Sequence, residues 1–449
     1  MRSPCDNRIP EYAQTAAKAL RTAGFEAHFV GGCVRDVTMG REPHDWDLTT
    51  SALPEEMHRA FAGFRTVDTG LRHGTVTVLI DGRSLEVTTY RLDGDYSDHR
   101  HPDGVTFTRD LTEDLARRDF TMNAMAMTPE GKLLDPFGGR EDIERRVIRC
   151  VGDPETRFRE DALRILRALR FAAVLGFTID PATAGAMSRC RELMKELSAE
   201  RVCSELTKLL CASKAGEVLR DYPAELGVLL PELLPAVGCR QHHFRHVYDV
   251  WGHTCEVVRR IRPEPALRWT ALLHDLGKPA CRTVGEDGLD HFPGHAAESL
   301  RLAEAVTERL RFDGETRRRV LFLVEHHDGR IPPELKAARR ALSRFGPDDL
   351  LDLIEFFEAD NLGQSPAFHH EGEDYEKLAD MVRTMLREKE CFTLSRLAVK
   401  GDDLTALGIR GPTVGESLRF LLDAVIEEKC PNDRQMLLDY LKKRKTDAL

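Results

Sequence analysis

The chain has 449 residues and a formal net charge of −10, with 41% hydrophobic and 31% charged residues. This composition is typical of folded globular proteins, and the length predicts two to four domains. We expect no transmembrane helix, because no run of about 18 uncharged apolar residues occurs, and no secretory signal, because residues 1–10 lack an apolar stretch. The negative charge argues only weakly against a nucleic-acid partner, since one basic face can hold a phosphate backbone. The 11 cysteines form no CxxC pair, which favours a reducing, cytoplasmic location over a disulfide framework.

The first third of the chain alternates strand patterns with helices. Residues 28–30 form a predicted strand end, residues 75–80 a β-branched strand, and residues 85–90 alternate with period two. Residues 93–104 are polar and rich in Gly and Asp, which predicts a flexible loop. After about residue 140 the strand signals stop, and residues 161–175 begin a succession of apolar and amphipathic helical runs. The sequence therefore predicts an α/β N-terminal domain followed by about 300 helical residues.

Gly31 and Gly32 directly follow the first predicted strand and precede a helix. Glycine lets the backbone approach a phosphate, and the start of a helix presents free N–H groups to an anion. Asp45 and Asp47 come next, and on a strand this spacing places both carboxylates on one face, with Trp46 on the other. Two adjacent hard oxygen ligands suit Mg²⁺, and a pair of such ions can clamp both oxygens of a phosphoryl transfer. The alternative is a DxD sequence in an ordinary surface turn.

Further polar side chains could complete such a site. Glu86 interrupts the apolar alternation of its predicted strand, so it either faces solvent or provides a third carboxylate. Arg117 and Arg118 are adjacent guanidinium donors that suit triphosphate oxygens. Asp119 and Asn123 are four residues apart, which predicts that they share a helix face and could bind a ribose hydroxyl. A capped helix start with surface arginines is the alternative.

The order of these motifs carries a family resemblance. GGCVRD, DWD, EVTTYR, RRDFTMNA, DPFGG and RFREDALRILRALRFA succeed one another within residues 28–177. This order resembles that of the class II tRNA nucleotidyltransferases, the bacterial and eukaryotic CCA-adding enzymes, which are related to bacterial poly(A) polymerases. The resemblance implies an α/β nucleotidyltransferase palm, with a small mixed sheet plus helices, followed by an all-α neck, body and tail.

The resemblance also implies roles for individual residues. It implies Mg²⁺ ligation by Asp45 and Asp47, with Glu86 as a less certain third carboxylate. The residues implied in triphosphate and ribose binding are Gly31, Gly32, Arg35, Arg118, Asp119 and Asn123. The implied partners are the tRNA 3′ end, CTP and ATP, and no DNA or membrane partner is expected.

Glu160, Asp161 and Arg164 match the EDxxR motif of this family. Asp161 and Arg164 are three residues apart, which predicts neighbouring side chains on one helix face. A carboxylate accepts from an exocyclic amine, and a guanidinium donates to ring nitrogens and carbonyl oxygens, so the pair could read the edge of cytosine or adenine. Glu160 could hold Arg164 in place from one turn away. A salt bridge on a surface helix is the alternative.

A second cluster contains histidines and aspartates downstream. His274 and Asp275 follow an apolar helical run over residues 269–273, and this HD pair resembles the HD phosphohydrolase superfamily, whose facing helices bind a divalent metal. The implied metal ligands are His253, His274, Asp275 and Asp360. The residues that could complete a second metal or bind phosphate are His295, His326 and His327. Imidazole favours Ni, Mn, Fe or Zn over Mg. The implied substrates are 2′,3′-cyclic phosphates, 2′-nucleotides or phosphate esters, whereas histidines that only hydrogen-bond within the core are the alternative.

We therefore predict four domains. These are a nucleotidyltransferase head at residues 1–145, a neck and body with the templating helix and RNA binding at 146–235, an HD domain at 236–370, and a tRNA-binding helical tail at 371–449. In the tail, Gly and Pro between two amphipathic helices predict a tight turn within residues 401–412, whose N–H groups could meet RNA phosphate. Simple packing of the two helices is the alternative.

The predicted activity is addition of C, C and A to tRNA. A poly(A) polymerase is disfavoured, because residues 67–75 lack the basic G-[RK]-[RK]-F-[RK] stretch of those enzymes. An enzyme that adds only A or only CC stays open. A phosphohydrolase with a degenerate head is the third hypothesis, and the intact carboxylates Asp45, Asp47 and Glu86 argue against it.

Overall fold

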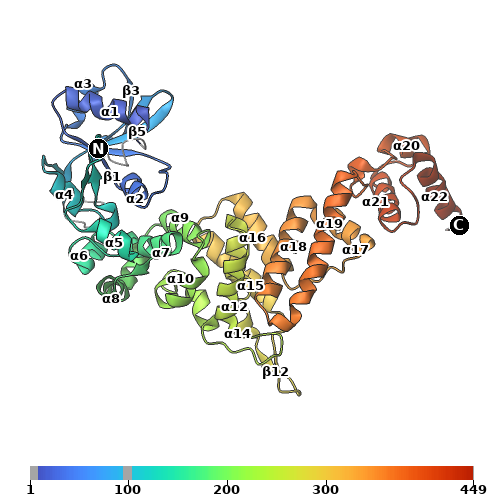
Figure 1. The fold of residues 1–449 in the computed structure, drawn as a ribbon. Helices are drawn as coiled ribbons and strands as arrows, with labels where there is room; N and C mark the ends of the chain where they lie inside the picture. The colour runs from blue at the N-terminus through green and yellow to red at the C-terminus, as the bar shows by residue number, and fades with distance from the viewer. Residues whose placement is uncertain (1–8, 95–103, 448–449) are drawn as a thin grey trace. The chain divides into compact units, whose positions relative to one another are not determined.

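Figure 1 shows the fold in a computed structural model, which describes residues 9–94 and 104–447. The chain divides into two compact units, Met1–Pro231 and Glu232–Leu449, and each is described by itself. Most of the flexible loop predicted at residues 93–104 lies outside the described residues. Within the described ranges, no helix combines the length and apolar character needed to cross a membrane.

The first unit is built on a seven-stranded sheet with the order β3-β4-β5-β2-β1-β8-β9. Its strands are β1 (Ala27–Val30), β2 (Asp47–Thr50), β3 (Arg65–Gly70), β4 (Thr75–Ile80), β5 (Arg83–Thr89), β8 (Ala126–Met127) and β9 (Leu133–Leu134). Strands β2 and β5 pair in parallel, and the other neighbouring pairs are antiparallel. The predicted small mixed sheet is therefore confirmed. A separate antiparallel pair joins β6 (Arg91–Asp93) to β7 (Val105–Phe107).

Five helices accompany this sheet. They are α1 (Glu11–Thr22), α2 (Gly32–Thr38), α3 (Pro54–Ala60), α4 (Leu111–Ala116) and α5 (Gly139–Arg145). The buried residues of α1, which include Ala13, Ala16, Ala17 and Leu20, recur with helical spacing. Their small side chains let α1 pack closely on β1 and β4, so the helix supports the strand that leads into Gly31.

The remainder of the first unit is mainly helical. Its helices are α6 (Pro154–Glu160), α7 (Leu163–Leu175), α8 (Pro181–Cys190), α9 (Ala199–Leu210), α10 (Ala215–Asp221) and α11 (Pro223–Leu226). The prediction that strands stop near residue 140 was incomplete, because β10 (Val147–Ile148) pairs in parallel with β11 (Thr178–Ile179). Two-residue strands are too short to produce a period-two pattern. The helix predicted from residue 161 begins at Leu163 instead, because Asp161 adopts an extended conformation.

The second unit is a stack of helices. The helices up to residue 387 are α12 (Val250–Arg260), α13 (Pro265–Leu273), α14 (Lys278–Cys281), α15 (His295–Arg309), α16 (Gly314–His326), α17 (Leu335–Phe345), α18 (Pro347–Leu362) and α19 (Gly372–Arg387). A small hairpin joins β12 (Thr283–Val284) to β13 (Asp290–His291). Helix α13 is buried from Ala266 to Leu273 and contacts α12, α15, α16 and α18. A helix that is buried all round lies at the centre of its bundle, so the residues at its end lie among several other helices.

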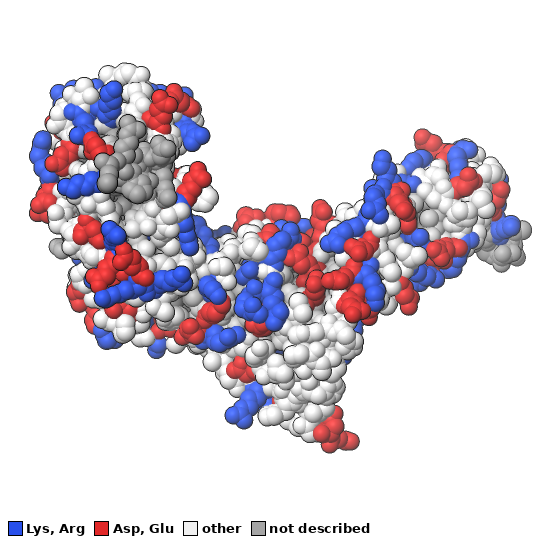
Figure 2. Space-filling view, viewed as in Figure 1, with Lys and Arg blue, Asp and Glu red and all other residues white. Residues whose placement is uncertain are grey.

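The chain ends in α20 (Gly401–Ala406), α21 (Pro412–Ile426) and α22 (Arg434–Asp447). Gly408 and Gly411 have φ of 80° and 65°, and Pro412 starts α21, so the predicted Gly- and Pro-containing turn is present. On the face drawn in Figure 2, basic side chains alternate with acidic ones over the C-terminal helices. The short 3₁₀ turns of the chain are Leu71–His73, Thr121–Asn123, Arg191–Glu196, Pro231–Ala236, Pro366–Glu371 and Leu394–Arg396.

Candidate functional site

The turn between β1 and α2 brings backbone and guanidinium close together. Gly31 has φ 74° and ψ −131°, a conformation that favours glycine. A Cβ atom at Gly31 would lie 3.1 Å from Nη1 of Arg118. The missing side chain therefore leaves room for Arg118 over the start of α2.

Three carboxylates lie close together around the start of β2, an interior strand of the sheet. Asp47 is the first residue of β2 and lies opposite Glu86 in the parallel pairing with β5. Asp45 was predicted on the same strand, but it lies in the bend before β2, because the strand begins only at Asp47. Trp46 is buried, and its ring meets Phe29 edge-on with centroids 5.0 Å apart.

Burial raises the pKa of Asp47 to about 6, and the neighbouring Glu86 and Asp45 carboxylates add to this effect against the opposing charge of Arg118. Ionised Asp47 is therefore destabilised in the chain alone. A divalent cation between these carboxylates would relieve their repulsion, so the residues fit a Mg²⁺-type site.

Most of the predicted head residues line one cavity of about 800 Å³. The predicted residues on its wall are Gly31, Gly32, Arg35, Asp45, Asp47, Arg118, Asp119, Asn123, Asp161 and Arg164. Glu86 and Glu160 are not on the wall. Glu86 faces Asp47 in the strand pairing, and Glu160 accepts a hydrogen bond from Arg164. The structure thus brings predicted residues from four separate motifs to one place.

Asp119 and Asn123 meet across a 3₁₀ turn and not along the predicted helix face. Oδ1 of Asp119 accepts from Nδ2 of Asn123 at 3.0 Å, and Oδ2 accepts from Nε of Arg167 at 2.8 Å. Burial opposes ionisation, but Arg167 and Asn123 hold the pKa of Asp119 at about 2. Asn123 in turn accepts through Oδ1 from Nη1 of Arg35 at 3.0 Å.

The EDxxR residues lie at a break between two helices, which corrects the prediction of one shared helix face. Asp161 ends α6 with φ −140° and ψ 104°, whereas Arg164 lies in the first turn of α7. The Asp161 side chain accepts through Oδ1 from the N–H of Leu163 at 3.0 Å and through Oδ2 from Nη2 of Arg201 at 2.9 Å. The extended residue re-aims its carboxylate, which a continuous helix would not do.

The Arg164 guanidinium is buried and held on several sides. Nη1 donates to Glu160 Oε2 at 2.6 Å and to the Arg157 carbonyl at 3.1 Å, and Nη2 donates to the Arg117 carbonyl at 3.0 Å. The predicted support of Arg164 by Glu160 is therefore present. The two carbonyl partners were not predicted from the sequence.

Several wall residues of this cavity were given no binding role by the sequence reasoning, and four of them are Phe171, Arg167, Arg170 and Arg201. Phe171 carries three guanidinium groups around its ring, with Arg35, Arg167 and Arg170 at 5.2, 5.4 and 4.1 Å from the centroid. Arg201, the fourth, pairs with Asp161. Helical spacing from Arg164 would have found Arg167 and Phe171, which lie three and seven residues further along.

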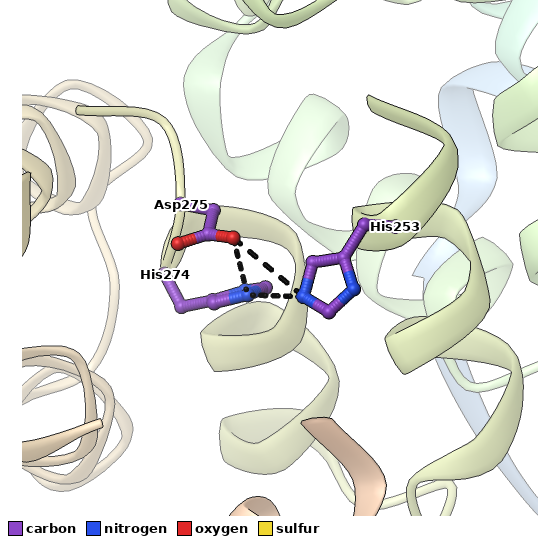
Figure 3. Close-up of side chains that lie close together, drawn as sticks. All are labelled: His253, His274 and Asp275. Carbon is purple, nitrogen blue, oxygen red and sulfur yellow. Dashed lines mark hydrogen bonds and ion pairs between the residues drawn. The ribbon is translucent and has the colours of Figure 1, made fainter. Parts of the chain in front are cut away.

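In the second unit, the predicted HD residues come together from three helices. Nε2 of His253, on α12, lies 2.9 Å from Oδ1 of Asp360, on α18. His274 follows α13, and its Nε2 lies 3.2 Å from Oδ2 of Asp275. Figure 3 shows both imidazoles directed toward the Asp275 carboxylate. Burial of His253, His274 and Asp275 is nearly complete, and such a set is unusual without a bound cation.

Two of the three remaining histidines join this cluster. His295 and His327 bring their Nε2 atoms to 3.2 Å from each other and to 3.6 and 3.7 Å from Oδ1 of Asp275. His326 does not join it, because its ring packs on Phe322 and Phe345. A histidine pair on a helix points in two directions, so only one can reach the HD pair.

A cavity of about 480 Å³ opens beside this cluster. Its wall includes Asp275, His295 and His327 together with the cations Lys278 and Arg330. Nζ of Lys278 lies 2.7 Å from Oδ2 of Asp275. The sequence reasoning assigned no role to these two cations, although Lys278 follows the HD pair within three residues.

Three family models match the chain in succession. They are the poly A polymerase head domain at residues 27–149, the probable RNA and SrmB-binding site of polymerase A at residues 176–236, and the HD domain at residues 243–364. A polymerase head and an HD domain both indicate the use of divalent metals.

Two relatives are similar over nearly the whole chain, and a third is similar over about half of it. The CCA-adding enzyme of Bacillus velezensis is 36% identical over 424 residues, which cover 94% of this chain and 95% of that protein. The solved structure of the Bacillus stearothermophilus CCA-adding enzyme in complex with CTP is 30% identical, has a TM-score of 0.74, and covers 100% of this chain and 99% of that one. The CCA-adding enzyme of Geobacillus kaustophilus is 52% identical over 209 residues, which cover 46% of this chain, and the match spans about half of that relative, 51%.

The raised pKa of Asp47 predicts a pH dependence of local stability. The unfolded chain ionises this carboxyl near pH 4, whereas the folded chain holds the proton until about pH 6. The unfolded state therefore binds fewer protons between these values, and the metal-free fold loses stability as the pH rises. Between pH 5 and pH 7.5, the free energy of unfolding should fall by about 1 kcal/mol less in Asp47→Asn than in the parent chain.

Hydrogen exchange of peptides covering β2, in buffer with a chelator, measures this loss. Asp221→Asn, at an exposed position of α10 in the same unit, is the matched control and should leave the pH dependence as it is. Equal losses in the parent chain and in Asp47→Asn would show that Asp47 ionises normally.

Proposed function

Because the chain belongs to the family of CCA-adding enzymes, we propose that it adds C, C and A to the 3′ end of tRNA from CTP and ATP, without a nucleic-acid template. One observation carries the proposal most directly. The Asp45 and Asp47 carboxylates, the Arg118 guanidinium and the EDxxR pair Asp161 and Arg164 line a single cavity. A nucleotidyltransferase that selects bases without a nucleic-acid template needs a metal site, a hydrogen-bond donor for the triphosphate and side chains that recognise the base.

The proposed metal is Mg²⁺, held by Asp45 and Asp47 with Glu86 beside Asp47. When bound, it would neutralise charge on the triphosphate and activate the attacking tRNA hydroxyl. Arg118, which is packed against Gly31, would hold the triphosphate. Asp119 and Asn123, which already hydrogen-bond each other, would meet the ribose.

The base would be selected by hydrogen bonds from the protein. Asp161 would accept from the exocyclic amine that cytosine and adenine share, and Arg164 would donate to the ring nitrogen or carbonyl. The contacts of Arg164 with Glu160 and two carbonyl groups fix the orientation of its guanidinium. A side chain that is already fixed loses little conformational entropy when the base binds, which favours discrimination against uracil and guanine.

The four-part division at residues 1–145, 146–235, 236–370 and 371–449 also stays a proposal, with tRNA bound by the second and fourth parts. Three successive family matches support it. A cytoplasmic location is proposed as well, and the scattered cysteines, which form no CxxC pair in the sequence, support it. Within the same chemistry, an enzyme adding only A or only CC, or a poly(A) polymerase, is the alternative.

We expect Asp47→Ala to lower nucleotide addition by at least about a thousandfold, because metal-assisted charge neutralisation supplies much of the rate of phosphoryl transfer. The assay incubates the chain with tRNA lacking CCA, CTP, ATP and Mg²⁺, and sequences the product ends. Asp81→Ala, at an exposed turn of the same sheet, should keep the parent rate. Products ending in CC or in a run of A would select one of the alternatives, and undiminished addition by Asp47→Ala would refute the metal assignment.

Arg164→Ala should change which nucleotide is added as well as how fast. Each hydrogen bond lost from a charged donor is worth about 1.5–3 kcal/mol, so selectivity against UTP and GTP should fall roughly tenfold to a hundredfold. Competition assays with mixed nucleotides measure this ratio. Glu160→Gln keeps the guanidinium but loosens it, and should have a smaller effect of the same kind. A uniform slowing with all four nucleotides would show that Arg164 only forms a structural salt bridge and does not select the base.

We propose a second activity, hydrolysis of phosphate esters such as 2′,3′-cyclic phosphates, for the HD residues. The support is the buried set of His253, His274 and Asp275, joined by Asp360. The proposed metal is Ni, Mn, Fe or Zn, since imidazole ligands favour these ions over Mg. The chain would then be able to trim damaged RNA ends before addition.

His274→Ala combined with Asp275→Ala should abolish hydrolysis of a 2′,3′-cyclic nucleotide while CCA addition continues. Asp47→Ala should give the reverse pattern, because the two residue sets lie in separate units. Activity that is equal in the parent and the HD variant would assign the hydrolysis to a contaminant.

A further inference from the structure

We propose that the aromatic pair His243 and Phe244, beside the HD cavity, is a stacking platform for the base of the phosphate-ester substrate. The substrate is then a nucleotide or the terminal nucleotide of an RNA, and a phosphate ester without a base binds less tightly. The inference rests on the hydrolysis proposed above, and base binding can be measured separately from that hydrolysis.

Phe244 leaves an unusually large part of its ring in contact with solvent. Its surface is 62% exposed, and Val247 and Tyr248 of the same segment are 55% and 42% exposed. No other phenylalanine among the described residues is as exposed. Single exposed apolar residues are normal, but three within five residues of a segment that lines a cavity indicate a surface for a ligand.

The exposed ring belongs to a row of rings that begins on the cavity wall. His243 lines the cavity of about 480 Å³, and its ring centroid lies 4.1 Å from that of Phe244 at an interplanar angle of 30°. Phe368 follows at 5.6 Å from Phe244, and the Arg245 guanidinium covers Phe368 at 4.3 Å from the ring centroid. Nucleobases stack on Phe and His rings and on guanidinium planes, so this row can receive a base that extends from the cavity.

The segment that carries the two rings is held on both sides. The N–H of His242 donates to Oδ2 of Asp290 at 2.7 Å, and the N–H of Asp290 donates to the His242 carbonyl at 3.0 Å. On the other side, the Arg245 guanidinium donates to both carboxylate oxygens of Glu371 at 2.7 and 3.1 Å. The Arg245 carbonyl accepts from the N–H of Ser365 at 2.8 Å. The rings are therefore exposed on a fixed backbone, and a platform fixed in advance loses little entropy when a base binds.

The same cavity provides for the phosphate. Its wall includes Asp275 of the HD pair and the cations Lys278 and Arg330, which suit phosphate oxygens. Nζ of Lys278 donates to Oε1 of Gln241 at 3.1 Å, two residues before His243, so a cation for the phosphate is tied to the segment that carries the rings. Ligand pockets measure about 300–1,000 Å³, and this cavity therefore has room for one nucleotide.

The test compares two cyclic esters with the full chain in the presence of Mn²⁺. One is 2′,3′-cyclic AMP, and the other is glycerol 1,2-cyclic phosphate, which has the same five-membered cyclic phosphate but no base. Phe244→Ala should raise the KM for 2′,3′-cyclic AMP about tenfold, the effect of losing one aromatic stacking partner. It should leave kcat unchanged, and it should leave both constants for the glycerol ester unchanged.

Two further variants control for the position and the ring. Phe244→Tyr keeps an aromatic ring and should keep the KM of the parent chain. Val247→Ala, which shortens another exposed side chain of the same segment, should also behave like the parent. CCA addition at the parent rate shows that each variant is folded.

Binding separates the platform from the hydrolysis. Equilibrium dialysis of 2′,3′-cyclic AMP in a chelating buffer measures binding without turnover, and any binding in the head is common to the parent and to Phe244→Ala. Weaker binding by Phe244→Ala, with no hydrolysis by the parent, would overturn the hydrolysis and leave the platform standing. Equal binding by the two chains, or an equal change in KM for both esters, would overturn the platform whether or not the parent hydrolyses them.

Discussion

The parallel pairing of β2 with β5 is the constraint on which the head site depends. It sets Asp47 against Glu86 at a place where burial already raises the pKa of Asp47 to about 6. Negative charge gathered in this way opposes folding unless a cation binds. The sheet therefore gathers carboxylates that a cation would stabilise. They lie near the point where β1 leads into Gly31, and Arg118 lies close by. In the proposed function, phosphate, metal and base would meet in the one cavity that these residues line.

The HD cluster follows the same principle with different ligands. Helix α13 is buried over its length, so the residues at its end are removed from water, and His274 and Asp275 need partners there. Those partners come from α12, α15, α16 and α18. In both sites, functional polar atoms are buried without complete compensation inside the protein. The fold is locally less stable at these atoms, and a bound cation would stabilise it.

Periodicity and motif order predicted the mixed sheet, the helical remainder and the wall of the head cavity. They did not predict local breaks, because residue spacing assumes regular geometry. Asp161 was expected inside a helix but adopts an extended conformation, and Asp45 was expected on a strand but precedes it. Contacts with backbone carbonyls, such as those of Arg164 with Arg117 and Arg157, leave no trace in side-chain patterns. The choice between His326 and His327 depends on helix rotation, which packing alone decides.

One of these carbonyl contacts has a mechanical consequence. The Arg117 peptide accepts from the Arg164 guanidinium at 3.0 Å, and the next residue along the chain is Arg118, which lies beside Gly31. If Arg164 reads the base and Arg118 holds the phosphates, as proposed above, both functions depend on one backbone segment. A displacement of that segment would move Arg118 and the carbonyl that holds Arg164 together. Under the proposed roles, a change that moves this segment would affect both the selectivity and the rate of addition.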